Sequence, residues 1–533
     1  MKRINVNLNV FLTIIIAAGF LVWSGLFIYQ SSFITIDRQR SYSLFDDAMI
    51  SMRYAWNFSH GQGLVWNAGE YVQGYTNLLM VLIMSLVTLF LSKTTSVLMI
   101  QILGAFFMLM IAGMNAKIAS VIFSNDNNDH KKFFVVLAFL CGLVYYPLAY
   151  WSLMGMETGL LSVLLLSGVF FALQYTRETK PMYLLLFSTA GGLAFLTRND
   201  SFIFFFILWG YLCVDGFRAR DGKNKVQWYL ASAGLYFVFI VGELWFQYMY
   251  YGQFLPNTYV LKMTGMPLPL RIQNGLGFIW PYLKEAIVVL TFSIIALLFH
   301  FHKQKLLLFS LFAVSVIYQV YVGGDPWNYW RIMSPTMPLL LLLTVDGAFV
   351  LGKYVVKFSG IQKNGFNLAV SLALLVACVG MINLRFWPEI FFHSKPFQVN
   401  ANYRNANIAV ALNDILTPSA TVGVFWAGTI PYYVDSKAID FLGKSDVYIA
   451  NLPPDLSGSV SFNGMASVPG HNKYDLKYSI VELKPTYVQK FFWGSQNVDS
   501  MAEDNYVVVK YRYMTLYLLK DSPDVNWKRL GLR

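Results

Sequence analysis

Residues 9–29, NVFLTIIIAAGFLVWSGLFIY, form an apolar run without a charged side chain. A hydrocarbon core of ~30 Å is crossed by about 20 helical residues, so this run has membrane-spanning length. Lys2 and Arg3 precede it as in a signal peptide, but no small-residue cleavage site follows, which indicates a retained helix. Further apolar runs lie near residues 77–92, 96–122, 133–150, 159–175, 182–197, 201–214, 228–250, 286–301, 305–322, 336–352 and 367–384.

These runs predict a polytopic all-α membrane bundle of roughly 11–13 helices. The composition agrees, because 56% of the 533 residues are hydrophobic and only 13% are charged. Soluble proteins carry about 25% charged residues. The three cysteines all lie in apolar runs and lack the spacing of a metal site, so they resemble small core residues.

The net charge of +12 does not indicate nucleic-acid binding, because of where the charge lies. Residues 390–533 hold 14 Lys/Arg and 12 Asp/Glu, so an excess of +10 remains for the apolar part. Positive residues in short loops are typical of the cytoplasmic side of a membrane protein. The groups expected there are Lys2-Arg3, Lys131-Lys132, Arg177 with Lys180, and Arg218 with Arg220, Lys223 and Lys225.

The chain divides near Pro388, after which long apolar runs cease. We expect a transmembrane domain over residues 1–389 and a soluble α/β domain over 390–533. In the second domain, 403–416 has helical periodicity, whereas 421–426, 438–441 and 506–519 have strand character. With the N-terminus inside, loop 31–76 faces outward. If Lys131-Lys132 lie on the inner side, the chain must cross the membrane an odd number of times between residues 77 and 122. Hydropathy indicates two crossings there. Either a third short span or a re-entrant or interfacial helix would resolve this conflict.

Two adjacent acids, Asp46 and Asp47, stand in the first polar loop between apolar runs. One interpretation is a helix cap, because acids favour a helix N-terminus and Gly61 or Gly63 would suit its end. The other is a catalytic base with a supporting acid. The two interpretations are compatible, since a helix mouth is open to a ligand.

Charged residues recur at the edges of later apolar runs, as Glu157, Arg198, Lys262 and Arg331. Taken singly, each of these residues can be explained as the cap of a helix at the membrane interface, or as a side chain that extends toward the lipid headgroups. Arg198, between two apolar runs, is costly unless it lies at an interface or faces a polar cavity. Together the three cations would suit a phosphate group, for which arginine offers a bidentate fork.

The polar motifs follow one another in a distinctive order along nearly the whole chain. The motifs are Asp46-Asp47-Ala48 with Arg53-Tyr54, residues 63–67, Gly69-Glu70 with Gly74-Tyr75-Thr76, residues 155–158, Leu196-Thr197-Arg198, Tyr251-Gly252 with Pro256-Asn257-Thr258 and Lys262, Gly323-Gly324-Asp325 with Arg331 and Pro335, residues 428–433, residues 440–443, and Gly470-His471. Their order resembles the mycobacterial terminal β-(1→2)-arabinofuranosyltransferases and their bacterial relatives, which are membrane glycosyltransferases of the GT-C fold.

The resemblance implies transfer of a sugar from a polyprenyl-phosphate donor to a glycan, lipid or protein acceptor of the cell envelope. The place would be the outer face of a bacterial cytoplasmic membrane, with the C-terminal domain extracytoplasmic. Asp46 would be the base of an inverting single displacement and Asp47 its support. Arg198, Lys262 and Arg331 would bind the donor phosphate. Substrate or cavity contacts would be Arg53, Glu70, Tyr75, Glu157, Asn257, Asp325 and His471.

A transporter or flippase of lipid-linked sugars is the main alternative, because it too needs a polar cavity in an apolar bundle. Matched broken helices in two halves, the usual sign of such transporters, are absent from the sequence. An enzyme that moves phosphoethanolamine would need a nucleophile beside a metal cluster, which six scattered histidines do not supply. Some enzymes of this fold use a divalent metal beside their acids, and the sequence leaves that open.

Overall fold

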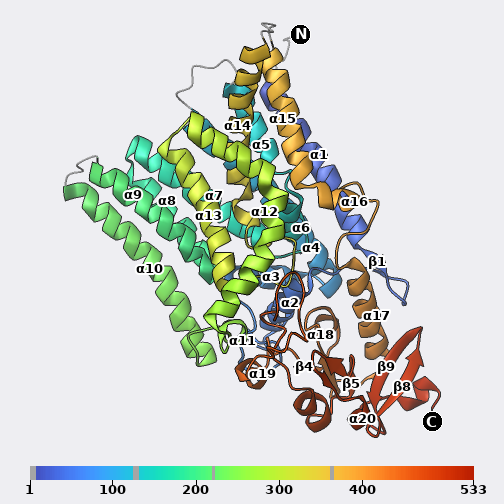
Figure 1. The fold of residues 1–533 in the computed structure, drawn as a ribbon. Coiled ribbons are helices and arrows are strands. Elements are labelled where there is room, and N and C mark those ends of the chain that lie inside the picture. The colour runs from blue at the N-terminus through green and yellow to red at the C-terminus, as the bar shows by residue number, and fades with distance from the viewer. Residues whose placement is uncertain (1–7, 124–130, 219–222, 360–364, 533) are drawn as a thin grey trace.

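Helices make up most of the first 390 residues of the computed structural model, which describes residues 8–123, 131–218, 223–359 and 365–532. Within those residues, seven single helices are long and apolar enough to cross a membrane, and two bent helix pairs would raise the number to nine. The expected polytopic all-α bundle is therefore confirmed, although the seven to nine candidate spans of the described residues are fewer than the roughly 11–13 helices expected. The helices that run along it (Figure 1) are α1 Leu8–Ser31, α4 Lys93–Ile122, α5 Lys131–Cys141, α7 Thr158–Glu178, α8 Pro181–Thr197, α9 Phe202–Arg218, α10 Lys223–Tyr251, α12 Leu268–Phe299, α13 Lys303–Val322, α14 Met337–Ser359 and α15 Phe366–Ile382.

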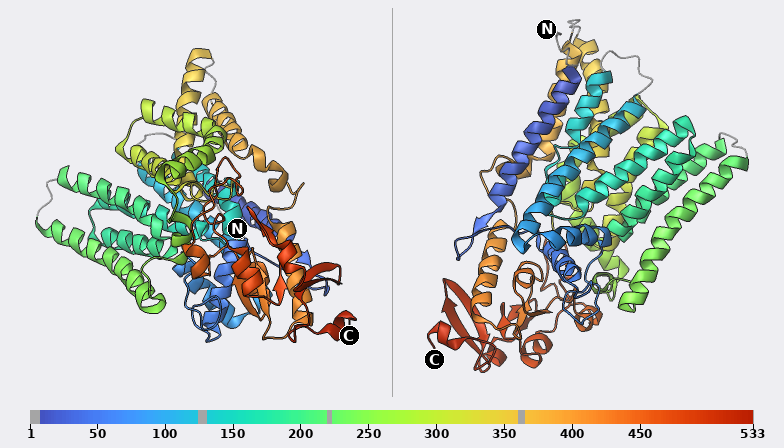
Figure 2. Two further views of the ribbon diagram at one scale, coloured as in Figure 1. Left: turned by 60° about the horizontal axis from the view of Figure 1, so that its bottom comes forward. Right: turned by 180° about the vertical axis from the view of Figure 1, so that it is seen from behind.

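The centre of the bundle is formed by α7 and α14, whose most apolar windows are 78% and 67% buried. The corresponding window of α10 is only 11% buried, so α10 lies at the periphery and presents apolar side chains outward. Figure 2 shows α10 at the edge of the bundle, beside α8 and α9. Local sequence sets some ends: Pro181 begins α8, and Gly323, with φ +89°, ends α13.

Helix α3 (Leu78–Phe90) explains the charge conflict between residues 77 and 122. Its 13 residues span about 20 Å, which is short of the ~30 Å hydrocarbon core. It lies with α2 (Asp46–Ser59) toward the end of the bundle that carries the C-terminal domain, and α4 alone then runs back along the bundle (Figure 1). One helix of membrane length together with one short apolar helix in this stretch is the arrangement that the second of the two solutions expects.

The C-terminal region contains a five-stranded sheet of order β4-β3-β5-β9-β8. Strands β4, β3 and β5 are parallel, whereas β9 and β8 are added antiparallel. Helix α17 (Val399–Ile415) matches the expected helix over 403–416. The strands are β3 Thr421–Val424, β4 Lys437–Asp440, β5 Tyr487–Val488, β8 Tyr506–Tyr511 and β9 Met514–Leu519.

The first two strands confirm the expectation, but the single strand expected over 506–519 is wrong, because that segment is a hairpin. Its turn places Arg512 and Tyr513 at φ +45° and +67°, a conformation usually signalled by glycine or asparagine. The smaller elements are β1 Phe33–Ile34, β2 Arg40–Ser41, α6 Tyr146–Leu153, η1 Asn199–Ser201, α11 Asn257–Met263, η2 Ser334–Thr336, η3 Leu384–Phe386, α16 Trp387–Ile390, α18 Thr429–Tyr433, α19 Val447–Asn451, η4 Lys477–Glu482, β6 Phe492–Trp493, β7 Gln496–Asn497, α20 Asp499–Ala502 and η5 Trp527–Leu530.

The C-terminal region packs on the loop that follows α1 and on α2. Asn402 of α17 donates a hydrogen bond of 2.8 Å to the Leu44 carbonyl, and the Tyr433 hydroxyl donates one of 2.6 Å to the Tyr42 carbonyl. Figure 1 places this region at the end of the bundle opposite the end of α7 and the start of α8. The start of α2, with Asp46 and Asp47, thus lies between the helix bundle and the C-terminal region.

Candidate active site

A cavity of about 600 Å³ opens where the helix bundle meets the C-terminal region. Its walls come from α2, from the α8–η1–α9 turn, from α10, α11 and α13, and from two loops of the C-terminal region. Four carboxylates and four cations line it together with many apolar and aromatic side chains. The charged residues are Asp47, Glu157, Asp200, Asp325, Arg198, Lys262, Arg331 and Lys444.

The two adjacent acids at the start of α2 point in different directions. Asp47 lines the cavity with Ile50 and Ser51, which follow at helical spacing on the same face. Asp46 is buried outside the cavity lining, and its Oδ1 accepts a hydrogen bond of 3.2 Å from the Thr429 N–H. Neither carboxylate caps the helix, because the N-cap residue is Phe45 and has no side-chain cap.

The environments of the two acids separate their pKa values. Burial raises the pKa of Asp46 to about 7, although Lys444 opposes that shift. Burial would also raise the pKa of Asp47, but the neighbouring Lys444 and Arg331 hold it well below its usual range. Asp47 is therefore an ionised carboxylate facing the cavity, whereas Asp46 gains and loses a proton near neutral pH.

Arg331 links the acids of two distant loops. Its Nη1 lies 3.1 Å from Asp47 Oδ2, and its Nη2 lies 2.8 Å from Asp325 Oδ2. Burial works against the charge of Arg331, but Asp325 and Asp47 outweigh it and raise the arginine pKa. Arg331 Nε is buried and has no hydrogen-bond partner among the described residues, so the guanidinium has one donor unused.

Lys444 enters the cavity from the C-terminal region and forms an ion pair with Asp47. The turn that carries it is fixed on both sides. Asp440 accepts a 2.8 Å hydrogen bond from the Ser445 N–H, and Gly443 adopts φ +78°, which suits glycine. From the other side, Asn257 Nδ2 donates to the carbonyls of Gly443 and Lys444, at 2.9 and 3.0 Å.

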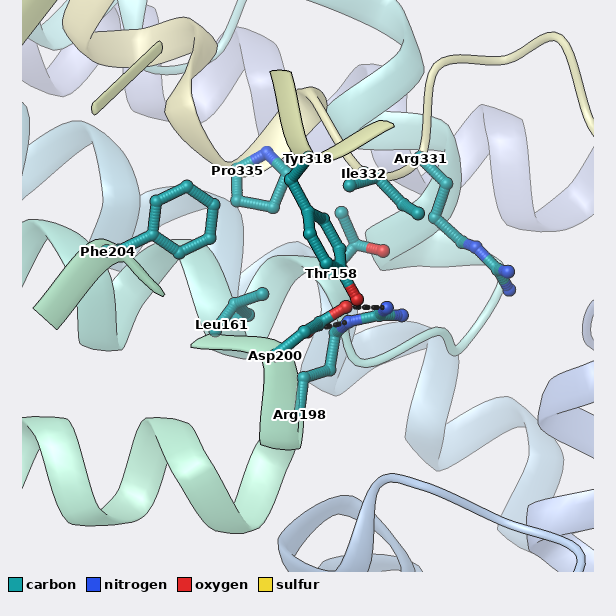
Figure 3. Close-up of a pocket in the computed structure, with 9 residues that line it drawn as sticks. All are labelled: Thr158, Leu161, Arg198, Asp200, Phe204, Tyr318, Arg331, Ile332 and Pro335. Carbon is teal, nitrogen blue, oxygen red and sulfur yellow. Dashed lines mark hydrogen bonds and ion pairs between the residues drawn. The ribbon is translucent and has the colours of Figure 1, made fainter. Parts of the chain in front are cut away.

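Arg198 is held in a second charged group. Figure 3 shows its guanidinium with Asp200, which it contacts at 2.6 Å, and Tyr318, whose hydroxyl hydrogen-bonds Asp200. The same guanidinium contacts Glu157 at 2.9 Å. Glu157 also accepts a 3.3 Å hydrogen bond from Asn77. Arg198 therefore faces a polar cavity and is paired with two carboxylates, as one of the two explanations of a cation at this position expects.

Lys262 differs from the other three cations of the cavity. It has no ion-pair partner within 4.0 Å in the part of the chain that the structure describes. Burial lowers its pKa to about 8, and the neighbouring Arg331 contributes in the same direction. Its aliphatic chain packs near Gly470, where an added Cβ would lie 3.1 Å from Lys262 Cε. A buried cation without a carboxylate partner is a suitable place for an anionic ligand.

The structure brings most of the expected site residues together. Asp47, Tyr75, Glu157, Arg198, Lys262, Asp325 and Arg331 all line the one cavity. Lys444 and Asp200 also line it, although the sequence does not single them out. Lys444 lies in a turn motif, 440–446, whose sequence indicates only a strand end, and Asp200 lies two residues after Arg198. The presence of an acid two residues after a buried arginine is the sequence signal that could have identified Asp200.

Four expected contacts lie outside the cavity lining. Arg53 donates to the carbonyls of Trp66, Pro431 and Ser436, and so joins α2 to the C-terminal region. Glu70 forms a partly exposed ion pair with Lys437, with 40% of the Glu70 side chain exposed. Asn257 holds the Lys444 turn. His471 is buried among Trp327, Trp426 and Trp493, and burial lowers its pKa to about 3, so it is neutral.

Metal-binding groups of three or more His, Cys, Asp or Glu do not occur among residues 8–123, 131–218, 223–359 and 365–532. The carboxylates of the cavity are instead distributed between the cations. Asp47 and Asp325 contact Arg331, and Glu157 and Asp200 contact Arg198.

Comparison with solved structures identifies the fold. The chain matches ArnT from Cupriavidus metallidurans bound to undecaprenyl phosphate, with 12% identity and a TM-score of 0.56, over 96% of this chain and 98% of that one. It also matches the archaeal oligosaccharyltransferase AglB from Archaeoglobus fulgidus in complex with an inhibitory peptide and a dolichol-phosphate, with 11% identity and a TM-score of 0.52, over 95% of this chain and 75% of that one. These structure neighbours are GT-C glycosyltransferases, and the present chain has the GT-C fold.

Sequence comparisons add one further match. Residues 396–525 match the model of a domain of unknown function, DUF8728. That segment begins just before α17 and contains all five strands of the sheet. No curated protein matches the chain by sequence.

Proposed function

We propose that this chain transfers a sugar from a polyprenyl-phosphate-linked donor to a glycan, lipid or protein acceptor of the cell envelope. The observation that carries the proposal is the cavity, in which unpaired Lys262 faces the carboxylate of Asp47 between apolar walls. An ionised acid can accept the proton of an attacking hydroxyl, and a free cation can stabilise a departing phosphate. The GT-C fold supports the same reaction class.

In the proposed reaction, the acceptor oxygen forms a bond to the anomeric carbon while the bond from that carbon to the phosphate oxygen breaks. The acceptor proton passes to Asp47, and the bonding electrons leave with the polyprenyl phosphate. A single displacement inverts the anomeric configuration. The family resemblance implies Asp46 as the base and Asp47 as its support. We reverse these roles and assign Asp47 as the base. Asp47 lines the cavity, whereas Asp46 accepts a hydrogen bond from the Thr429 N–H and lies outside the cavity lining.

The donor phosphate would bind at Lys262 first, because that cation needs to break no ion pair. Arg331 adds its unused Nε donor. Lys444 and Arg198 contribute further positive charge around the phosphate, and the carboxylates paired with each of them hold the side chain in position. Charge that develops on the leaving oxygen would then meet preorganised donors, and such electrostatic stabilisation of the transition state dominates the rate enhancement of many enzymes.

The apolar part of the cavity suits a prenyl chain. Phe202, Leu244, Phe254 and Leu255 line it beside the charged groups. Phe202, Phe254 and Leu255 are also at least half exposed on the bundle surface, where α10 is peripheral. A lipid chain could therefore lie along α9 and α10 while its phosphate reaches Lys262, without crossing the packed centre of the bundle.

We place the cavity and the 390–533 domain on the extracytoplasmic side of a bacterial cytoplasmic membrane. Arg177 at the end of α7 and Lys180 before α8 lie at the opposite end of the bundle (Figure 1). Positive residues in short connections favour the cytoplasm. Of the other basic groups, Lys2, Arg3 and Arg220 lie outside the described residues.

An arabinofuranosyl donor remains our proposal for the sugar, supported by the order of the motifs. The test is mass spectrometry of envelope glycans from a deletion strain complemented with wild type or Asp47→Asn. We expect loss of one sugar residue in the deletion strain and in the Asp47→Asn strain. An unchanged glycan, with lipid-linked precursor accumulated on one leaflet, would overturn the proposal in favour of a flippase.

A further inference from the structure

Helix α10 carries an acid in the middle of an apolar, membrane-length segment. Glu243 is 3% exposed, and Gln247, one turn further along the helix, is 1% exposed. Acids inside membrane helices are rare and usually face a functional cavity. Nothing in the proposed phosphate site or the base uses either residue.

The acid fixes the direction of the neighbouring amide. Gln247 Nε2 donates a 3.2 Å hydrogen bond to Glu243 Oε1. An ionised carboxylate only accepts, so it pairs with the amide nitrogen and favours this orientation of the amide group. Gln247 Oε1 is thereby turned away from Glu243, and Gln247 lines the cavity. Among the described residues this oxygen has no hydrogen-bond partner.

Two more neutral polar side chains line the same cavity. Asn199 lies beside Glu243, and its buried Nδ2 has no hydrogen-bond partner among the described residues. Thr258 is buried on α11, and its Oγ1 has no partner within the described part of the chain. Thr258 stands one helical turn before Lys262, so both project to the same face of α11.

Unpaired buried polar atoms cost free energy unless a ligand satisfies them. Gln247 Oε1 offers an acceptor, the Thr258 hydroxyl offers a donor or an acceptor, and neither carries charge. The hydroxyl groups of a sugar need this mixture, whereas a sugar carboxylate would find no cation among these three side chains. Buried hydrogen-bonding sites of this kind discriminate strongly between ligands with and without the matching group.

We propose that Gln247, Thr258 and Asn199 form the subsite for the sugar of the donor, that this sugar is neutral, and that Glu243 is a positioning residue. The inference rests on the proposed function, because it takes the phosphate at Lys262 as its neighbour. A sugar hydroxyl donates to Gln247 Oε1, and a second hydroxyl pairs with Thr258. Glu243 acts only through the Gln247 amide that it orients, since it does not itself line the cavity.

The experiment measures the affinity of the purified full-length chain in detergent for two kinds of lipid. The first is undecaprenyl phosphate without a sugar. The second is the same lipid phosphate carrying arabinofuranose, mannose or glucuronate, each measured separately. We expect at least one neutral-sugar lipid to bind about tenfold or more tightly than undecaprenyl phosphate, and the glucuronate lipid to bind no more tightly. Gln247→Leu should remove this sugar-dependent gain and leave undecaprenyl phosphate binding unchanged. Glu243→Gln should reduce the same gain by a smaller factor.

Gln319→Leu is the matched control, because Gln319 is a buried glutamine of α13 whose amide has no partner among the described residues and which does not line the cavity. It should leave both affinities unchanged. Thr258→Val, which keeps the side-chain shape, serves as the second variant if Gln247→Leu does not fold. Suppose that wild type binds a neutral-sugar lipid more tightly than undecaprenyl phosphate. The inference is then overturned if Gln247→Leu and Thr258→Val lower the affinities for both lipids by the same factor, or lower neither affinity. Wild type that binds neither lipid would instead reject the proposed function, and the subsite with it.

Discussion

Lys444 of the C-terminal region and Asp47 at the start of α2 form an ion pair across the boundary between the two parts of the molecule. They are separated by 397 positions in the sequence. The side chains are only 14% and 19% exposed, so the pair is shielded from water. The C-terminal region therefore supplies one of the charges of the candidate active site, and the helix bundle alone would have an incomplete site.

Removing that charge should impair sugar transfer severely. Lys444→Met removes one of the preorganised cations that we assign to the departing phosphate, and loss of one such donor typically lowers the rate ~10²–10³-fold, so we expect transfer to fall at least ~100-fold. Lys444→Arg keeps the charge and should retain partial activity. The measurement is transfer from a radiolabelled lipid-linked sugar in membranes. Lys437→Met, at a partly exposed lysine of β4, is the control and should stay within about twofold, as expected for a surface ion pair.

The two adjacent acids should respond differently to the same isosteric change. Asp47→Asn removes the carboxylate that faces the cavity, and loss of a positioned base costs ~10²–10⁴-fold in rate. Asp46→Asn keeps an oxygen for the Thr429 N–H and should retain most transfer. Single-turnover rates in proteoliposomes check this. The opposite ranking would restore Asp46 as the base.

Asp46 also makes stability depend on pH in a defined direction. Its pKa is raised by burial from 3.8 to about 7, so between these values the folded state binds more protons than the unfolded state, and stability falls as pH rises. Asp46→Asn lacks this titration. We expect Tm of the variant to exceed that of wild type at pH 8.5 by several degrees, from a linkage of up to ~4 kcal/mol. At pH 4 this titration contributes little to the difference, and an advantage just as large there would contradict the mechanism.

The sequence predicted much of the candidate site because charges in apolar surroundings are informative. Arg198 and Arg331 are costly in a membrane bundle unless they face polar groups, and both line the cavity. Lys444 could not be found in the same way, since a lysine in a soluble domain is unremarkable. Only the packing of the 440–446 turn against Asn257 brings it to Asp47.

The choice between Asp46 and Asp47 also needed tertiary structure. Adjacent helical residues differ by about 100° in direction, and the sequence does not say which direction is the cavity. Arg53, seven residues after Asp46, lies on the same helix face and contacts the C-terminal region, as Asp46 does. The motif that contains all three residues therefore combines one cavity residue with two that join the parts of the molecule.

Donor binding should weaken in alkaline solution because of Lys262. Its pKa is lowered to about 8 by burial, so the ammonium that we assign to the donor phosphate is lost as pH rises through 8. Affinity for undecaprenyl phosphate should fall about tenfold for each unit above that value. Lys262→Arg keeps its charge at high pH and should move the decline upward. Affinity that stays level to pH 9.5 in wild type would remove Lys262 from the phosphate site.

A buried ion pair far from the cavity tests which charges serve the fold alone. Lys305 Nζ of α13 lies 2.6 Å from Asp346 Oδ2 of α14, with side chains 1% and 5% exposed, and His300 Nδ1 lies 3.3 Å from the other carboxylate oxygen. Lys305→Met leaves Asp346 without its buried ammonium and should lower stability by about 3–5 kcal/mol. The double change Lys305→Met/Asp346→Asn removes both charges and should recover much of that loss, because desolvating a charge is the main cost.

Thermal unfolding in detergent measures the difference in stability between the two variants. Sugar transfer per folded molecule should stay unchanged in both variants, since neither residue lines the cavity. A double variant no more stable than the single one would mean that packing around these side chains, and not their charge, holds α13 against α14.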